Sequence, residues 1–165
     1  MRRATKVLPP GGWTPAEQQG VVLLSYDDRY RRRTTLRDQA GGEFLLDLEK
    51  PRLLAHGEGL VLEGGGVIEV IAADEAVADI HTHNPAETVR IAWHIGNRHT
   101  PLQVLGKGIL RIRHDPILEA MAEGLGAHIY VKQAPFAPES GAYSAQATGH
   151  HHHDEHNHDN GHHHG

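Results

Sequence analysis

Residues 84–101 read NPAETVRIAWHIGNRHTP, and this stretch decides the fold of the second half of the chain. Asn84 can cap a helix whose first residue is Pro85 and whose third is Glu87. This arrangement satisfies backbone amides of the first turn that would otherwise lack a hydrogen-bond partner. The apolar side chains that follow continue the helix: Val89, Ile91, Ala92, Trp93 and Ile95. Gly96 or Asn97 is expected to end it in a left-handed cap. The stretch therefore predicts one helix with clear boundaries.

Short strand-like segments lie on both sides of this helix. We expect strands over residues 76–81, 102–105, 109–113 and 127–131, and a second helix over residues 116–123 that Asp115 can cap. The resulting order is strand, helix, strand, strand, helix, strand, which is the order of the ferredoxin-like split βαβ fold. The sequence thus predicts an α+β protein with a ferredoxin-like domain.

The first seventy residues follow a different pattern, with short strands separated by turns. Strands are expected over residues 20–26, 34–36 and 43–48, and a hairpin joins residues 59–62 to 67–71 through a run of three glycines. We therefore expect three parts: a small β domain over residues 1–73, the ferredoxin-like domain over residues 74–143, and a disordered His-rich tail over residues 144–165.

Composition narrows the class of protein. The formal net charge is −5 over 165 residues, and the chain has no cysteine, which excludes a disulfide scaffold and thiolate metal ligands. An early run of arginines indicates a solvated strand face, with nucleic-acid binding as the weaker alternative. Nothing resembles a signal peptide or an apolar membrane span of about 18 residues. We expect a cytoplasmic protein with neither nucleic-acid nor membrane partners.

The last sixteen residues, 150–165, hold nine of the sixteen histidines, together with three carboxylates and no Lys or Arg. Imidazoles and nearby carboxylates collect divalent ions such as nickel, copper and zinc. Metal ligands are therefore predicted at His150, His151, His152, His153, His156, His158, His162, His163 and His164. An appended purification tag is the alternative. Because Asp, Glu, Asn and Gly interrupt the run, we interpret it as native sequence.

Among the other histidines, two pairs can take part in metal binding. His81 and His83 stand two apart on an expected strand, so they can face the same side and chelate together, or they are simply polar residues at a strand end. His94 and His99 are five apart across the expected helix end, so a continuous helix would not align them. A cap at the helix end would place His99 in an exposed turn.

A single surface histidine cannot hold a divalent ion, because such ions take four to six ligands. A twofold dimer would bring the same histidine from two subunits together, since an isologous contact places a patch against its own copy. Imidazoles of the tail can complete such a site.

Catalytic motifs are absent from the sequence. It contains no His-Glu-x-x-His motif, no Walker loop and no Gly-x-Ser-x-Gly elbow. An enzyme alternative would be a zinc hydrolase that uses His81, His83 and either His94 or His114, but the sequence shows no obvious carboxylate base beside these ligands. We expect a protein that is not an enzyme.

The segment AWHIGNRH, residues 92–99, closely resembles the urease accessory protein UreE family, whose hallmark is Gly-Asn-Arg-His after an aromatic-His segment. The resemblance continues through residues 101–103, His114 and Asp115, and the segment from Ala134 to Tyr143, and a His-rich end is common in the family. It covers residues 67–165 strongly and the N-terminal half by general pattern.

This resemblance implies a homodimeric nickel metallochaperone that delivers Ni²⁺ to apo-urease during urease maturation, with the urease accessory GTPase as a partner. His99 matches the interfacial nickel ligand of the family, donated by both subunits, and His114 matches its peripheral metal-binding histidine. Pro116 stands where some members carry a further histidine, so the secondary site departs from the family pattern. The imidazoles can also bind Zn²⁺ or Cu²⁺, so the expectation of nickel comes from the resemblance.

Two alternatives to delivery stay open. In the first, the protein stores or detoxifies nickel or zinc, the tail is the functional part, and the folded part only displays it. In the second, the N-terminal β half binds peptides, which is compatible with the delivery role because that half can dock a partner.

Overall fold

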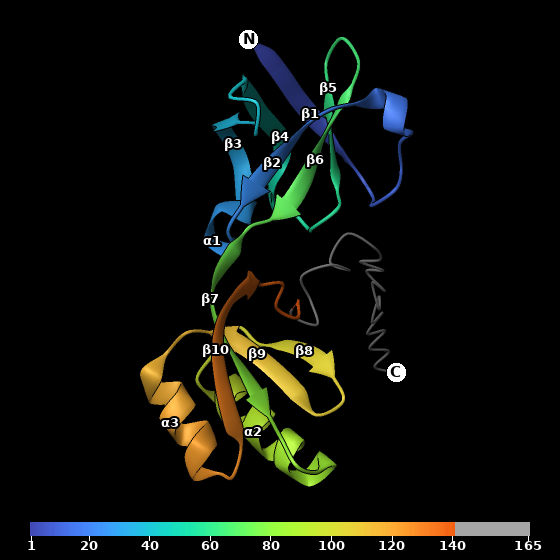
Figure 1. Ribbon diagram of the computed structural model, residues 1–165. Coiled ribbons are helices and arrows are strands. Elements are labelled where there is room, and N and C mark those ends of the chain that lie inside the picture. Colours follow the sequence, from blue (N-terminus) through green and yellow to red (C-terminus); the bar gives the residue numbers. More distant parts are fainter. Residues whose placement is uncertain (141–165) are drawn as a thin grey trace, which may run out of the picture.

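The computed structural model describes residues 1–140 and shows an α+β protein with two separate β-sheets. Figure 1 shows the sheets at opposite ends of an elongated molecule, with strand β6 (Val67–Ala72) leading almost directly into strand β7 (Asp74–His81). The tail histidines, His150 to His164, lie outside the described residues. In the described part, no helix has the length and apolar character needed to cross a membrane.

The N-terminal sheet has six strands in the order β2-β6-β5-β1-β4-β3. Their bounds, besides β6, are β1 Arg2–Leu8, β2 Gln18–Leu24, β3 Tyr30–Arg37, β4 Glu43–Leu53 and β5 Gly59–Leu62. A 3-10 turn, η1 (Pro15–Glu17), precedes β2, and a single helical turn, α1 (Tyr26–Arg29), separates β2 from β3. The pairs β1–β4 and β2–β6 are parallel, and the other neighbours are antiparallel.

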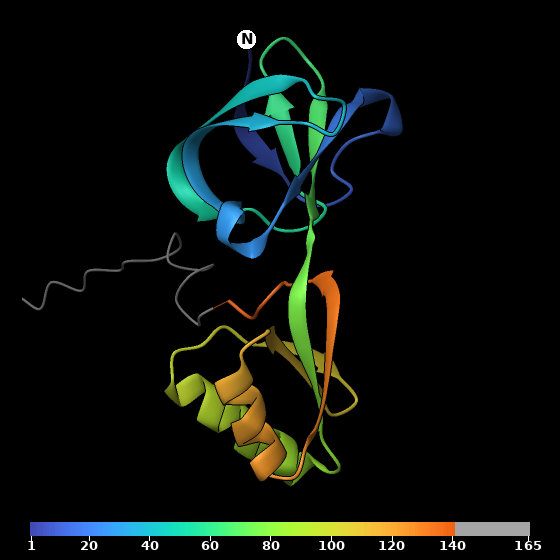
Figure 2. The ribbon, with the colours of Figure 1, turned by 60° about the vertical axis from the view of Figure 1, so that its left-hand side comes forward.

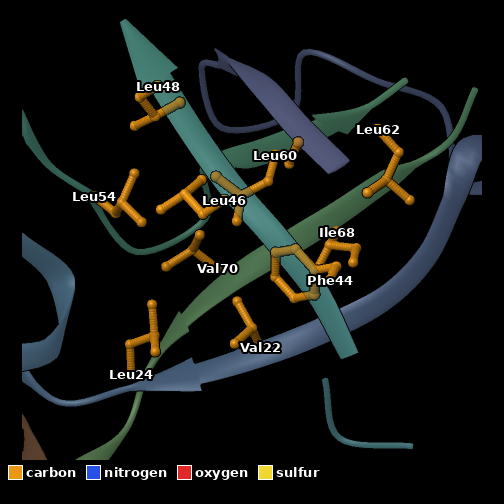
Figure 3. Close-up of a cluster of buried hydrophobic side chains, with 11 residues drawn as sticks. Val22, Leu24, Phe44, Leu46, Leu48, Leu54, Leu60, Leu62, Ile68 and Val70 are labelled. Atoms are coloured by element: carbon orange, nitrogen blue, oxygen red, sulfur yellow. The ribbon is translucent and has the colours of Figure 1, made fainter. Parts of the chain in front are cut away.

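The core of this sheet follows from period-two alternation along its strands. In β4, Phe44, Leu46 and Leu48 are buried, whereas the residues between them are partly exposed. Figure 3 shows these side chains packed against others from β2, β5 and β6, among them Leu60 and Val70. The apolar residues of the expected strands therefore form one continuous core.

The sequence does not predict the helical turns η1 and α1, and the expected strand over residues 20–26 ends at Leu24 because α1 begins at Tyr26. Strand β1 was not predicted either. It occupies Arg2–Leu8 and pairs with β4 and β5, so it lies inside the sheet. Arg2 donates to Asp38 at 2.7 Å, and Arg3 donates to Asp47 at 2.7 Å. Because these partners neutralise the arginines, a basic segment can occupy an inner strand.

The second sheet has four strands in the order β10-β7-β9-β8, and all neighbouring pairs are antiparallel. Its other elements are α2 Pro85–Asn97, β8 Gln103–Gly106, β9 Ile109–Arg113, α3 Pro116–Gly124 and β10 His128–Pro135. Both helices cover the same face of the sheet (Figure 2), where Ile80, Ile91 and Ile112 form part of a fully buried cluster. Strand β10 runs to Pro135, beyond the expected end at residue 131, because it pairs with β7 along its whole length.

The chain after β10 returns along strand β8. The backbone amide of Glu139 donates to the carbonyl of Leu102 at 2.8 Å, and the Glu139 carboxylate accepts from the backbone amide of Val104 at 3.0 Å. The amide of Ala137 donates to the side-chain oxygen of Gln103 at 3.0 Å. The last described residues are therefore fixed beside the edge strand of the second sheet.

The two sheets meet at a small junction built around α1. The ring of Tyr26 stacks on the buried ring of Phe136 with centroids 5.5 Å apart, and the Tyr26 amide donates to Glu75 at 2.9 Å. Arg29 is only 2% exposed, and its guanidinium donates to the carbonyls of Leu24 and Phe136. These contacts hold the segment after β10 against the N-terminal sheet.

Candidate metal site

His99 lies directly after helix α2 in an unusual backbone conformation. The helix ends at Asn97, Arg98 is its C-cap, and His99 has a φ of 54°. The left-handed cap residue is therefore His99 itself, and the expectation that Gly96 or Asn97 takes this conformation is wrong. Non-glycine residues adopt it at a cost of order 1 kcal/mol, and histidine is among those that tolerate it best.

The backbone of the cap satisfies the end of the helix and leaves the imidazole free. The amide of His99 donates to the carbonyl of Gly96 at 3.0 Å, and that of Arg98 donates to Ile95 at 3.1 Å. The His99 side chain is exposed and makes no hydrogen bond to any other residue between 1 and 140. The cap thus presents an unengaged imidazole at the helix end.

An exposed apolar face lies on the same helix. Val89 is 68% exposed and Trp93 is 60% exposed, and their spacing of four places them on one side of α2. Ile91 and Ile95 occupy the buried side. A shallow groove runs along the exposed side, lined by Pro85, Ala86, Val89, Arg90 and Trp93. Exposed large apolar side chains that lie together mark interaction surfaces.

His94 is separated from His99 by the helix end. Its ring is partly buried and meets the Trp93 ring edge-on, with centroids 5.0 Å apart. Its carbonyl accepts a hydrogen bond from the Arg98 side chain at 3.1 Å. His94 therefore packs beside the exposed apolar face.

His114 is held by a buried carboxylate that the sequence did not reveal. Glu119 is buried on α3, and its Oε2 lies 2.8 Å from His114 Nδ1 and accepts from the backbone amide of Asp115 at 2.6 Å. Asp115 caps α3 by accepting from the amide of Ile117 at 2.9 Å. A carboxylate on Nδ1 favours the tautomer whose Nε2 can bind a metal ion. The only sequence signal for this pair is a Glu in the first turns of α3.

His81 and His83 pack against different rings of strand β10. The His81 ring packs edge-on against Tyr130, with centroids 4.6 Å apart. The His83 ring packs against His128, which the sequence did not single out, at 4.9 Å, and His83 Nδ1 lies 3.0 Å from Glu87 Oε1. The register of β7 against β10, which sets His81 opposite His128, was needed to find the second pair.

A buried ion pair supports the open face of the second sheet. Asp79 accepts from Arg111 at 2.6 Å and 3.0 Å, and Lys132 lies 2.8 Å from the same carboxylate. Burial by itself raises the pKa of Asp79, but the hydrogen bonds and charges of Arg111 and Lys132 outweigh it and hold the pKa below its usual value. Asp79 is thus already fully engaged as a carboxylate.

Comparison with known families decides the identity of the chain. The model of the UreE urease accessory protein N-terminal domain matches residues 4–73, and the model of the UreE C-terminal domain matches residues 75–164. The chain belongs to the UreE family. The Urease accessory protein UreE of Bradyrhizobium sp. strain BTAi1 is 48% identical over 156 residues, covering 93% of this chain and 75% of that protein.

Other UreE proteins are similar to this chain at comparable identity. The Urease accessory protein UreE of Rhodopseudomonas palustris strain BisB18 is 49% identical over 153 residues, covering 93% of this chain and 72% of that protein. That of Rhizobium meliloti strain 1021 is 43% identical over 152 residues, covering 91% of this chain and 96% of that protein. These names describe accessory proteins and not catalysts.

In this UreE chain the candidate ligands do not converge. Across residues 1–140, no three His, Asp or Glu side chains lie close enough together to hold a metal ion. Because a divalent ion of this kind takes four to six ligands, an ion at His99 needs ligands from outside the described part of one chain. A second copy or the His-rich end of the chain can supply them.

Proposed function

We propose that this protein is a nickel metallochaperone that binds Ni²⁺ between two copies through His99 and delivers it to apo-urease in the cytoplasm. The urease accessory GTPase is the proposed partner in that delivery, and the protein itself catalyses no reaction. Membership of the UreE family supports the role in urease maturation. The conformation of His99 is the observation that carries the choice of site.

The geometry supports a shared site because His99 is exposed, unengaged and without ligand neighbours in its own described chain. In an isologous dimer, each patch meets its own copy, so two His99 imidazoles would approach one ion. The exposed face of Val89 and Trp93 lies on α2, the helix whose C-cap precedes His99, and offers the apolar surface for such a contact. We therefore propose that the homodimer forms along α2.

A site of this kind suits delivery better than permanent storage. Imidazole and water ligands at an exposed seam exchange readily, so ligands of a receiving protein can replace them one at a time. Imidazole must be neutral to bind a metal, and its reference pKa is near 6.5. Nickel affinity is expected to fall below about pH 6, and equal affinity at pH 5 and pH 7.5 would contradict a histidine site.

His114 and the tail histidines are proposed as auxiliary metal ligands. The Glu119 carboxylate orients the His114 ring for binding through Nε2. The same imidazoles can also accept Zn²⁺ or Cu²⁺. The alternative is a role in storage or detoxification, which would depend on the tail alone. It must be distinguished from delivery by experiment.

We also propose a division into domains at residues 73 and 74. One family match ends at residue 73 and the other begins at residue 75, and each sheet has its own buried cluster. For the second domain we propose the ferredoxin-like fold, supported by the antiparallel order β10-β7-β9-β8 and by two helices on one face. The first domain is proposed to dock partner proteins.

The deciding experiment is nickel calorimetry with light scattering on the full-length chain whose nine tail histidines are replaced by asparagine. Delivery through the interface predicts one tight Ni²⁺ per dimer, and its loss in the further variant His99→Ala. Storage predicts that the asparagine variant has already lost its tight nickel binding. A tight site that survives His99→Ala would remove His99 from the proposal.

A further inference from the structure

A second pair of histidines lies far from His99, at the opposite end of helix α2. His83 lies two residues after the end of β7 and just before Asn84, the N-cap of α2. His128 is the first residue of β10 and lies opposite His81 of β7 in the antiparallel register. Helix α2 has 13 residues and so rises about 20 Å. The two ends of the helix therefore present separate histidine positions.

The ring of His83 is held in place by Glu87. The Glu87 carboxylate accepts from the backbone amide of His83 at 3.1 Å and lies 3.0 Å from His83 Nδ1. The Glu87 carboxylate is mostly buried, and the backbone amide of Glu87 donates to the capping side chain of Asn84 at 2.9 Å. A carboxylate on Nδ1 favours the tautomer that keeps its hydrogen there, so Nε2 carries a free lone pair.

The spacing of the two rings suits one shared ion. The ring centroids of His83 and His128 are 4.9 Å apart and the ring planes are inclined by 72°. Two imidazoles on one divalent ion have metal–nitrogen bonds of about 2.1 Å, and a bond angle near the tetrahedral value then separates their ring centres by roughly 5 Å. Both histidines are exposed, so water can occupy the other positions around the ion.

We propose that His83 and His128 form a metal site within one chain, with Glu87 as its positioning residue and water as the remaining ligands. The ligands are two neutral imidazoles, so the site takes a borderline divalent ion such as Ni²⁺, Zn²⁺ or Cu²⁺. It needs neither a second copy nor the tail, and it stands independently of the interfacial role proposed for His99. Each chain thus carries a weak, solvent-accessible site at the far end of α2.

The test uses a full-length background in which the nine tail histidines are replaced by asparagine and His99 and His114 by alanine. Ni²⁺ is titrated into this protein by calorimetry, and one ion per chain is expected. His83→Ala or His128→Ala should each abolish that binding. Glu87→Gln keeps an oxygen to accept the hydrogen bond but removes the charge, and it should weaken binding about 10-fold to 100-fold.

His56→Gln is the matched control, because His56 lies in the N-terminal half, where its Nδ1 accepts from the amide of Ala72 at 3.1 Å. This change should leave the Ni²⁺ affinity unaltered. Circular dichroism and thermal unfolding of each variant show whether the fold is kept. If a variant does not fold, nitrogen NMR of the histidine rings in the folded background gives the answer, since Zn²⁺ should shift Nε2 of His83 and a ring nitrogen of His128.

The proposal is overturned if the background protein binds no Ni²⁺ and Zn²⁺ shifts neither ring, which would leave only an edge-to-face contact between two surface imidazoles. It is also overturned if binding survives His83→Ala in a folded protein. Because His99 is already absent from the background, neither result bears on the nickel site proposed between two copies.

Discussion

At the scale of single residues, helix α2 is followed by a histidine at a cap position where glycine is the usual choice. His99 takes the left-handed conformation with a φ of 54°, which Gly accepts without cost. Retaining a β-carbon there costs stability, and such strain clusters at functional positions. The helix-end signal predicted His99 in an exposed turn, and the family pattern gave its role as a ligand. Neither predicted its backbone conformation, because propensity rules place a left-handed cap at Gly96 or Asn97.

This strain can be measured by comparing two replacements at the same position. His99→Gly should be more stable than His99→Ala by about 1 kcal/mol, because only glycine is at ease at positive φ. Both variants lose the imidazole, so both should also lose interfacial nickel binding. Urea unfolding followed by circular dichroism gives the comparison. Equal stability of the two variants would show that position 99 is not held in the left-handed region.

A second residue-scale prediction concerns Asp79 and acid. The folded-state pKa of Asp79 lies below its unfolded value, so its stabilising effect is complete above the unfolded pKa of about 3.9 and is lost as the pH falls through the folded value. Asp79→Asn leaves Arg111 without its partner and should cost about 3 kcal/mol near neutral pH. The difference between wild type and Asp79→Asn should shrink below about pH 4. A difference that is independent of pH would contradict the ion pair.

At the scale of elements, periodicity and turn signals predicted most of the strands, and tertiary pairing decided the rest. Strands β5 and β9 have the expected bounds because a glycine marks the start of each: Gly59 is the first residue of β5, and Gly108 precedes β9. Strand β1 was not predicted, since its basic side chains become compatible with an inner strand only when Asp38 and Asp47 pair with them. The length of β10 depends on its pairing with β7, which no local pattern reveals.

The exposed face of α2 yields an element-scale prediction. Trp93→Ser should weaken dimerisation by at least about 30-fold, because a central aromatic side chain at an interface contributes about 2 kcal/mol or more. Light scattering over a dilution series measures the dimer fraction. Ile117→Ser is the matched control, since Ile117 is 81% exposed on α3 and should leave the dimer intact. Equal effects of both changes would place the dimer contact elsewhere.

At the scale of the whole molecule, the junction between the sheets depends on one buried guanidinium. Burial lowers the pKa of Arg29, and within residues 1–140 its Nε has no hydrogen-bond partner. Its other nitrogens join the carbonyl of Leu24 in the first sheet to that of Phe136 after the second. The sequence showed Arg29 only as part of an arginine run, because the partner carbonyl lies 107 positions away.

Replacing this arginine tests the junction. Arg29→Ala empties a buried site and leaves the Phe136 carbonyl without its partner, whereas the Leu24 carbonyl keeps the amide of Ala73. The change should lower the free energy of unfolding by about 2–4 kcal/mol. Amide hydrogen exchange should also become faster near Phe136. Arg31→Ala, which removes an exposed pair with Asp28 at 2.7 Å, is the control and should change stability by less than about 1 kcal/mol. A similarly small effect of Arg29→Ala would show that the sheets are held together by other contacts.

The return of the chain along β8 has a consequence for how far a bound ion would have to travel. Glu139 is tied to Leu102, only three residues along the chain from His99. Eleven positions separate Glu139 from His150, and an extended chain covers at most about 3.6 Å per residue, so His150 is confined within about 40 Å of that tie. An ion bound by the ligands proposed at that end would therefore stay within molecular reach of His99, where one tethered ligand corresponds to about a millimolar concentration.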